Sequence, residues 1–268
     1  MNDATTPDPR ATQRQRHPIR LRRLDVLAVE DLSPSMRRVT LGGPELAGFT
    51  SLGFDDHVKL FFLGAGQDPA LLPQQGPEGL VFPSAERPLA RDYTPRRFDP
   101  VAQTLVIDFA LHEAGPATAW ALQAAAGQTL LTAGPRGSMV IPLAFDWHLL
   151  AGDETALPAI GRRLEELPAG SRALVVAEVE GLGHEVPLPS AAAVTLVWSH
   201  RSRSTLAETL RATAFPPGDF FAWVAAESTL AKQLRALLLA EKGANPRWTK
   251  AAGYWKRGAA GVHDSIQN

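Results

Sequence analysis

The chain has 268 residues, of which 45% are hydrophobic, and its 27 basic and 28 acidic residues leave a formal net charge of −1. A chain of this length can bury a substantial core, and two small domains are the expected organisation. The near-zero net charge gives no reason to expect nucleic acid or an anionic membrane as a partner. Because there is no cysteine, disulfides, zinc–thiolate sites and cysteine-ligated iron–sulfur clusters are excluded, and redox chemistry would need a bound cofactor.

The first 17 residues are polar, contain proline and show no hydrophobic periodicity. Such a segment cannot bury enough apolar surface to offset the entropy of ordering, so residues 1–17 are predicted to be a disordered arm. The Arg22-Arg23 pair would suggest a twin-arginine export signal only if an uninterrupted apolar stretch followed it, and none does. No later apolar run is long enough to span a bilayer. The chain is therefore predicted to be soluble and cytoplasmic.

Residues 18–143 are predicted to form an antiparallel β-barrel or sandwich. Their apolar runs are short and rich in β-branched or aromatic residues, as in 58–63, 104–111 and 128–132. The segment 64–88 is rich in glycine and proline and is expected to be a long loop. One short helix is predicted at 116–125, where the residues are good helix formers and Gly127 follows.

Residues 144–268 are predicted to form an α/β domain that ends in a basic segment. Runs of strand length alternate with helical patterns there, which is typical of βαβ units around a parallel sheet. The expected strands are 147–151, 173–179, 194–198 and 220–225, and the expected helices lie near 154–166, 204–213 and 228–242.

Several common site motifs are absent. Neither a G-x-G-x-x-G fingerprint nor a Walker loop occurs, and His184-Glu185 lacks the second histidine of a zinc protease. The seven histidines are scattered, so no metal site is predicted.

The hexapeptide Arg91-Asp92-Tyr93-Thr94-Pro95-Arg96 combines a cation, an aromatic ring and a hydroxyl. On a β-strand, Arg91 and Tyr93 would share one face. Arginine pairs with phosphate, tyrosine stacks on an isoalloxazine ring, and a hydroxyl can bond the N5 edge of that ring, so the set fits a flavin nucleotide. An exposed edge strand with solvated arginines and one core tyrosine explains the motif alone equally well.

The R-x-Y-T sequence resembles the flavin-binding signature of the ferredoxin reductase superfamily, and the particular residues of the motif here resemble those of the siderophore-interacting protein family. Further blocks resemble that family in the expected order, across roughly Ile19 to Gly258: 57–62, 112–117, 134–138, 152–160 and 253–258. The resemblance implies an N-terminal flavin-binding barrel followed by a nicotinamide-binding α/β domain.

The resemblance also implies site residues in the first domain. FAD would be held by Arg91, Tyr93 and Thr94, and its ribityl or pyrophosphate region would be lined by His112, Gly115, Pro116 and Ala117. Ser138 would be a further phosphate or adenosine contact. The Gly-Pro pair would open a short helix whose terminal amides suit a phosphate.

In the second domain, Gly152, Asp153, Thr155 and Ala156 would bind the nicotinamide nucleotide at the end of the first parallel strand. Helix capping explains the acidic Asp153-Glu154 pair equally well. In similar reductases a Ser-Arg pair at the position of Arg201 contacts the 2′-phosphate of NADPH, which favours NADPH over NADH, although a solvated loop is an equal alternative. Glu227 would lie where the nicotinamide approaches the flavin, or simply begin a helix.

Lys59, Arg136, Lys256 and Arg257 match positions that the family places around a basic pocket beside the flavin. Such a pocket would concentrate an anionic ferric siderophore. The implied reaction is NAD(P)H-dependent reduction of chelated Fe(III), in which residues position the reactants and no certain catalytic acid or base is expected. The alternatives are a flavin reductase with another acceptor, a ferredoxin in place of the nicotinamide donor, and a siderophore-binding protein without turnover. A monomer is expected.

Overall fold

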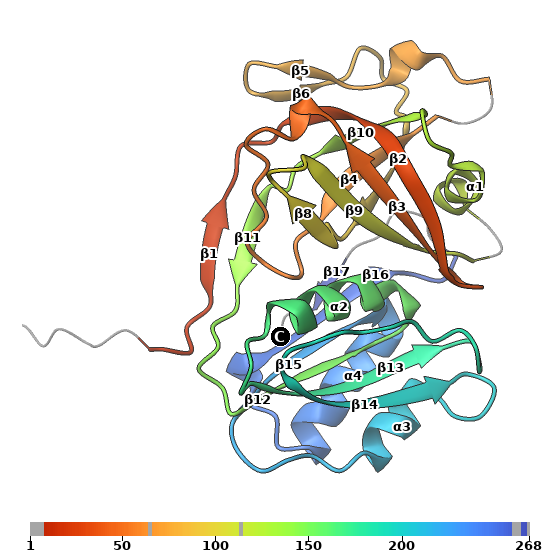
Figure 1. Ribbon diagram of the computed structural model, residues 1–268. Helices are drawn as coiled ribbons and strands as arrows, with labels where there is room; N and C mark the ends of the chain where they lie inside the picture. Colours follow the sequence, from red (N-terminus) through yellow and green to blue (C-terminus); the bar gives the residue numbers. More distant parts are fainter. Residues whose placement is uncertain (1–7, 64–65, 113–114, 259–263, 267–268) are drawn as a thin grey trace, which may run out of the picture.

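The computed structural model describes residues 8–63, 66–112, 115–258 and 264–266. Figure 1 shows an antiparallel half at the top and a parallel sheet with its helices below. None of the described helices is long and apolar enough to cross a membrane.

The upper half is a seven-stranded antiparallel sheet curled into a partly open barrel. In spatial order its strands are β7 (Leu89–Tyr93), β4 (Val58–Phe62), β10 (Thr129–Ala133), β2 (Leu21–Ser33), β3 (Met36–Gly42), β9 (Thr104–Ala110) and β8 (Arg97–Asp99). Alternate residues point inward, as Val39 and Leu41 do in β3, and form the core. The barrel predicted from the short β-branched runs is confirmed.

The sheet ends in the edge strands β7 and β8, and a helix packs on β4 and β9 beside this opening. The rings of Tyr93 and Phe109 approach each other across it, with centroids 4.4 Å apart. Helix α1 (Pro116–Gln123) packs Trp120 against Phe62 and Phe109, at centroid distances of 5.7 and 5.6 Å. Trp120 therefore fixes the helix against β4 and β9. A short 3₁₀ helix, η1 (Pro44–Leu46), follows β3.

The N-terminal arm is ordered where the structure describes it, so the prediction of a disordered segment over 1–17 is wrong for these residues. Strand β1 (Gln13–Arg16) pairs antiparallel with β11 (Gly137–Val140). Arg10 bonds the Asp219 carboxylate at 2.6 Å, and its guanidinium lies 4.7 Å from the ring centroid of Trp248. These contacts offset the entropy of ordering through backbone bonds and a charged side chain of the arm, which is why hydropathy did not reveal them.

The segment 64–88 also contains more structure than the predicted long loop. The 3₁₀ helix η2 (Pro69–Leu71) and the hairpin strands β5 (Gln74–Gly76) and β6 (Gly79–Val81) lie within it. Leu72 and Leu80 pack on the outer face of the barrel against Phe61 and Leu131. The segment is therefore a cover for the outer sheet face.

The lower half is a six-stranded sheet. Its order is β14 (Ala193–His200), β13 (Arg172–Val179), β12 (Trp147–Gly152), β15 (Phe220–Glu227), β16 (Thr249–Trp255) and β17 (Asp264–Ile266). Adjacent strands are parallel except β16 and β17. The four predicted strands are confirmed, whereas β16 and β17 were missed; in β16, Lys250 and Gly253 interrupt the apolar pattern.

Helices cover both faces of this sheet. Helix α2 (Leu157–Glu166), preceded by η3 (Glu154–Ala156), packs on the face toward the barrel. Helices α3 (Leu206–Ala212) and α4 (Ser228–Glu241) pack on the opposite face, and η4 (Pro246–Trp248) leads into β16. The predicted helices are confirmed, and with the barrel they confirm the expected β plus α/β fold.

The two halves are joined through loop 51–57 and helix α2. Arg162 of α2 donates to the carbonyl oxygens of Ser51 at 2.9 Å and Pro95 at 3.0 Å. The ring of Phe54 meets Trp223 of the parallel sheet edge-on, with centroids 5.4 Å apart. Because Pro95 follows Thr94 directly, these contacts hold the R-x-Y-T motif against the parallel sheet.

Candidate functional site

Strand β7 carries Arg91 and Tyr93 on the inner face of the barrel sheet. The register pairs them with the core residues Leu60 and Val58. Within the described residues, the Arg91 guanidinium donates only to the Ala90 carbonyl oxygen, at 2.7 Å, and has no carboxylate partner. Strand β7 is indeed an edge strand, as the alternative interpretation supposed, but Arg91 keeps most of its five N–H donors free for an anion.

Tyr93 and Thr94 are held more tightly than a solvated edge strand would hold them. Tyr93 packs against Phe109, and burial raises the pKa of its phenol. Thr94, just beyond the strand, has only 6% of its surface exposed. An aromatic ring and a buried hydroxyl thus stand beside an unpaired guanidinium, which are the groups that bind a flavin ring and its phosphates.

The N-terminus of α1, a helix that contacts β4 and β9, is shaped by Gly115. Gly115 is its N-cap with φ of +153°, and a Cβ there would lie 2.9 Å from His112 Cε1, so the close approach requires glycine. Pro116 takes the first helical position, and Ala117 is buried behind it. The predicted His112 and Gly115 therefore meet, and the first-turn amides of the helix, which lack an intrahelical partner, suit an anion.

Ser138 has a structural role. Its hydroxyl donates to Asp56 at 2.6 Å, accepts from the Leu52 amide at 2.9 Å, and lies 2.8 Å from His17 Nε2. A hydroxyl has one proton and two lone pairs, so these partners satisfy it. The Ser138 side chain ties β11 to the arm and to loop 51–57, and its contact with a nucleotide stays a prediction.

Asp153, at the carboxyl edge of the parallel sheet, joins three segments. It accepts from the Thr155 amide and hydroxyl, at 3.0 and 2.5 Å, and from the Glu227 amide and the Trp255 indole, at 3.1 and 2.9 Å. Burial raises the pKa of Asp153 to about 6, against the opposing effect of these bonds. The capping interpretation of Asp153 is confirmed, and it uses the Thr155 hydroxyl as well.

Gly152 and Ala156 complete this edge. A Cβ on Gly152 would lie 2.2 Å from the Ala225 carbonyl oxygen and 2.3 Å from Ala156 Cβ, so glycine is needed for the strands and η3 to approach. Glu227 caps α4, with its carboxylate accepting from the Thr229 and Leu230 amides at 2.7 and 3.1 Å. Its helix-start interpretation is confirmed.

Arg201 is surrounded by acidic groups. Its guanidinium pairs with Glu154 at 2.6 Å, Glu178 at 3.1 Å and Glu180 at 2.7 Å. Although burial opposes it, these carboxylates raise the pKa of Arg201. A nucleotide phosphate that approaches this guanidinium would meet the negative charge of these carboxylates.

The four predicted substrate cations fall into two groups. Lys59 pairs with Asp92 at 2.7 Å, and Arg136 is exposed on the segment that follows β10, the strand that pairs with the strand of Lys59. Lys256 and Arg257 are exposed after β16, whose end is fixed by the bond between Trp255 and Asp153. The described contacts join Lys59 to the barrel and Lys256-Arg257 to the parallel sheet, without a direct link between the two groups. No cluster of potential metal ligands occurs among the described residues.

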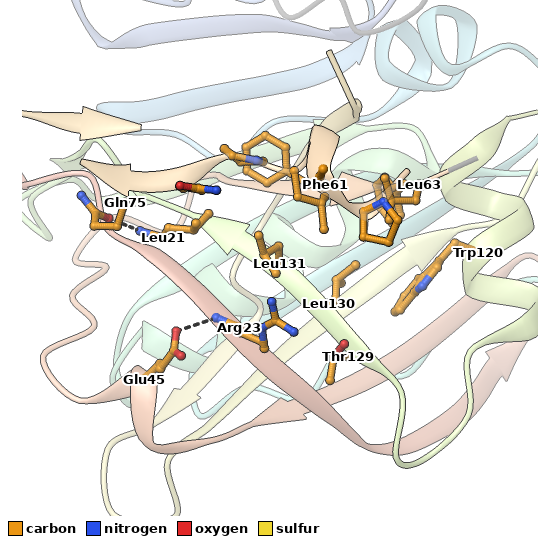
Figure 2. A pocket seen from close by; sticks show the side chains of 16 residues that line it. Leu21, Arg23, Glu45, Phe61, Leu63, Gln75, Trp120, Thr129, Leu130 and Leu131 are labelled. Atoms are coloured by element: carbon orange, nitrogen blue, oxygen red, sulfur yellow. Dashed lines mark hydrogen bonds between the residues drawn. The ribbon is translucent and has the colours of Figure 1, made fainter. Parts of the chain in front are cut away.

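A separate pocket of about 730 Å³ lies on the outer face of the barrel, under the segment that covers it (Figure 2). Leu21, Arg23, Phe61 and Leu131 form its floor, and Trp120 of α1 lies at its rim. None of the predicted site residues lines it.

The motif search gave no role to Asp55 and Tyr254, which meet where the two halves join. The Tyr254 hydroxyl donates to the Asp55 carboxylate. Tyr254 lies in the block 253–258, which carried the family resemblance without a residue-level role, and Asp55 had no signal of its own.

The comparisons with known proteins agree with this architecture. The family model for a siderophore-interacting FAD-binding domain matches residues 25–139, and that for a siderophore-interacting protein matches residues 145–258. The NADPH-dependent ferric-chelate reductase of Escherichia coli K12 is 38% identical over 92% of this chain and 97% of its own length. The ferric vibriobactin reductase ViuB of Vibrio cholerae is 30% identical over 88% of this chain and 90% of its own.

Among solved structures, a siderophore utilization protein from T. fusca superposes with a TM-score of 0.86 at 36% identity. The superposition covers 94% of this chain and 98% of that protein, so both halves are shared.

Proposed function

The chain belongs to the siderophore-interacting protein family, and we propose on that premise that it is an FAD-dependent ferric-siderophore reductase that uses NADPH to reduce chelated Fe(III) to Fe(II). The observation that carries the proposal is the Arg91 guanidinium, which has no carboxylate partner among the described residues and lies on the same strand as Tyr93, the residue directly before Thr94. We assign FAD binding to residues 18–143 and nicotinamide binding to residues 144–268.

The residues at the barrel opening fit FAD. Arg91 and the first amides of α1 would hold the phosphates, with His112, Gly115, Pro116 and Ala117 shaping that end of the site. Tyr93 would contact the isoalloxazine ring, and Thr94 would reach its N5 edge. When bound, FAD supplies the conversion between a two-electron hydride donor and a one-electron acceptor.

The carboxyl edge of the parallel sheet would receive the nicotinamide nucleotide. Ligands of α/β sheets enter at this edge, where Gly152 keeps the backbone bare and Asp153 fixes the turn into η3. Glu227 and Trp255, both held by Asp153, would border the nicotinamide end.

The substrate is a ferric chelate, and the cations Lys59, Arg136, Lys256 and Arg257 would attract its negative charge. One hydride carries two electrons, so each NADPH reduces two Fe(III) to two Fe(II) and releases NADP⁺ and one proton. Hard oxygen ligands hold Fe(III) more strongly than Fe(II), so reduction loosens the iron without cleavage of the chelator. No acid or base is needed for the electron transfer, and the protein's task is positioning.

The carboxylates around Arg201 support a second candidate for the electron donor. A 2′-phosphate meets Glu154, Glu178 and Glu180 there, so a donor without that phosphate, such as NADH or a ferredoxin, competes with NADPH. We further propose that the protein works as a monomer in the cytoplasm, where reduced nicotinamide is available.

Iron release tests the proposal directly. The purified protein, loaded with FAD, is mixed with NADPH, NADH or reduced ferredoxin and with ferric catecholate, hydroxamate or carboxylate siderophores, while a ferrous-specific chelator reports Fe(II). We expect Fe(II) at two equivalents per NADPH consumed, with at least one siderophore class. Failure of every donor with every siderophore class would refute the reductase assignment.

A further inference from the structure

Tyr254 stands at the junction of the two halves. It comes from β16 of the parallel sheet, its ring meets Trp223 edge-on with centroids 6.1 Å apart, and its hydroxyl donates to Asp55 of loop 51–57. Loop 51–57 precedes β4, the strand that pairs with the R-x-Y-T strand. Tyr254 therefore links the sheet that would receive the nicotinamide to the site that would hold FAD.

The same hydroxyl also reaches the flavin motif, because Thr94 forms a side-chain hydrogen bond with Tyr254. A carboxylate only accepts hydrogen bonds, so Asp55 takes the single proton of Tyr254. The Tyr254 oxygen can then act only as an acceptor toward Thr94. Thr94 must donate its own hydroxyl proton to Tyr254, so toward any other group the Thr94 oxygen can only accept a hydrogen bond.

The charges around these two hydroxyls favour donation from Thr94 to Tyr254 and from Tyr254 to Asp55. Lys250, on the same strand as Tyr254, places positive charge near Asp55, Arg14 of β1 lies near Lys250, and Asp56 is the other acidic neighbour. Asp56 is occupied by Ser51, the Gly53 amide and Ser138. Burial and the Asp55 carboxylate raise the pKa of Tyr254, so its proton stays in place.

We propose that Asp55 and Tyr254 are positioning residues that fix Thr94 as a hydrogen-bond acceptor toward the flavin N5 position. The inference rests on the proposed function, which places N5 at Thr94. The N5 atom of an oxidised flavin is an acceptor without a proton, whereas N5 of a reduced flavin carries one. An acceptor oxygen at Thr94 therefore stabilises the reduced flavin relative to the oxidised flavin.

The variant Tyr254→Phe tests the inference, because it keeps the ring on Trp223 and removes only the hydroxyl. Thr94 is then free to donate to oxidised N5. We expect the equilibrium between bound reduced and bound oxidised FAD to shift about tenfold toward the oxidised form, which lowers the two-electron midpoint potential by about 30 mV. A redox titration against reference dyes, followed by flavin absorbance, measures the shift without turnover.

Two further variants show whether a change in potential comes from the Asp55–Tyr254–Thr94 hydrogen-bond chain, called the relay below, or from a loosened interface between the two halves. Thr94→Val removes the same hydroxyl contact, so adding Tyr254→Phe to it should change the potential no further. Glu165→Gln weakens the interdomain bond to Arg96, at 2.6 Å, without touching the relay, and should leave the potential at the wild-type value.

Three results would overturn the inference: an unchanged or higher potential in Tyr254→Phe, the same drop in Glu165→Gln, or a full additional drop in the double variant. A thermal melt and the FAD content of each variant confirm that the folded holoprotein is compared. A wild type that binds no flavin would instead defeat the proposed function, whereas a wild type that releases Fe(II) while Tyr254→Phe keeps its potential would defeat the relay alone.

Discussion

The two predicted nucleotide sites differ in how their polar side chains are used. At the barrel opening, Arg91 has no carboxylate partner among the described residues. At the edge of the parallel sheet, Asp153 and Thr155 bond each other, and Arg201 is paired with three glutamates. The proposed flavin site thus keeps a guanidinium available for a ligand, whereas a ligand at the sheet edge meets side chains that already bond each other. We infer that FAD is a tightly held cofactor and that the electron donor binds more weakly.

The largest expected effect comes from Arg91→Ala. We expect FAD affinity to fall about 100-fold, because a hydrogen bond to a charged group contributes about 1.5–3 kcal/mol and Arg91 is the one cationic side chain that we assign to the phosphates. A fluorescence titration of the apoprotein with FAD measures it. Arg91→Lys serves as the control, and it should recover part of the loss by keeping the charge without the fork geometry. Unchanged FAD affinity in Arg91→Ala would remove Arg91 from the flavin site.

The buried carboxyl group of Asp153, at the edge of the parallel sheet, predicts that the free energy of unfolding depends on pH. Asp153 has its pKa raised from 3.8 to about 6, so the folded protein holds a proton there that the unfolded chain has released. Burial of the Asp153 charge costs no stability below the pKa that Asp153 has in the unfolded chain. The free energy of unfolding then falls as the pH rises from that value through the pKa of Asp153 in the folded protein, by up to about 1.4 kcal/mol per pH unit. Urea unfolding between pH 4 and 7 should show this slope.

Asp153→Asn removes the titration and should flatten this part of the stability profile, even though it lowers overall stability by losing an acceptor for the Glu227 or Trp255 donor. A profile as steep as that of the wild type would show that other groups cause the pH dependence.

At the donor site, we expect Arg201→Ala to raise the KM for NADPH by about tenfold at most and to leave that for NADH unchanged, because the guanidinium is already largely neutralised. Steady-state kinetics with both nucleotides separates the two. An equal effect on NADH would mean that Arg201 supports the fold of the edge and does not read the 2′-phosphate.

The smallest effect sharpens the comparison from the opposite side. Glu180 is the most exposed of the three partners of Arg201, with 62% of its side chain exposed, so Glu180→Gln frees the guanidinium with little structural change. We expect the KM for NADPH to fall about threefold, since an exposed ion pair contributes about 0.2–1 kcal/mol. Arg211, paired with Glu241 on the far helices, offers a matched control, because Glu241→Gln should change neither KM.

The sequence predicted well whatever depends on local order. Strand parity placed Arg91 and Tyr93 on one face, and helical spacing placed α4 over 228–241. Asp153 as a cap followed from its place before a helix.

Contacts distant along the chain were missed. Strand β1 shows no apolar alternation, because all four of its residues are exposed and backbone bonds join it to β11. Its partner also lies more than 120 residues away along the chain. The acidic surroundings of Arg201 come from three separate segments, and Asp55 meets Tyr254 across 199 residues. One chain has no local signal for such pairs, which is why the commitment of Ser138 and Arg201 to internal partners appears only in the fold.

The most direct test of the central claim is an anaerobic absorbance titration of the FAD-loaded protein, first with NADPH and then with a ferric siderophore. The account predicts that NADPH bleaches the flavin and that the ferric siderophore restores its colour while Fe(II) is released. A flavin that is bleached by NADPH or by dithionite but is not reoxidised by any ferric siderophore would contradict the account.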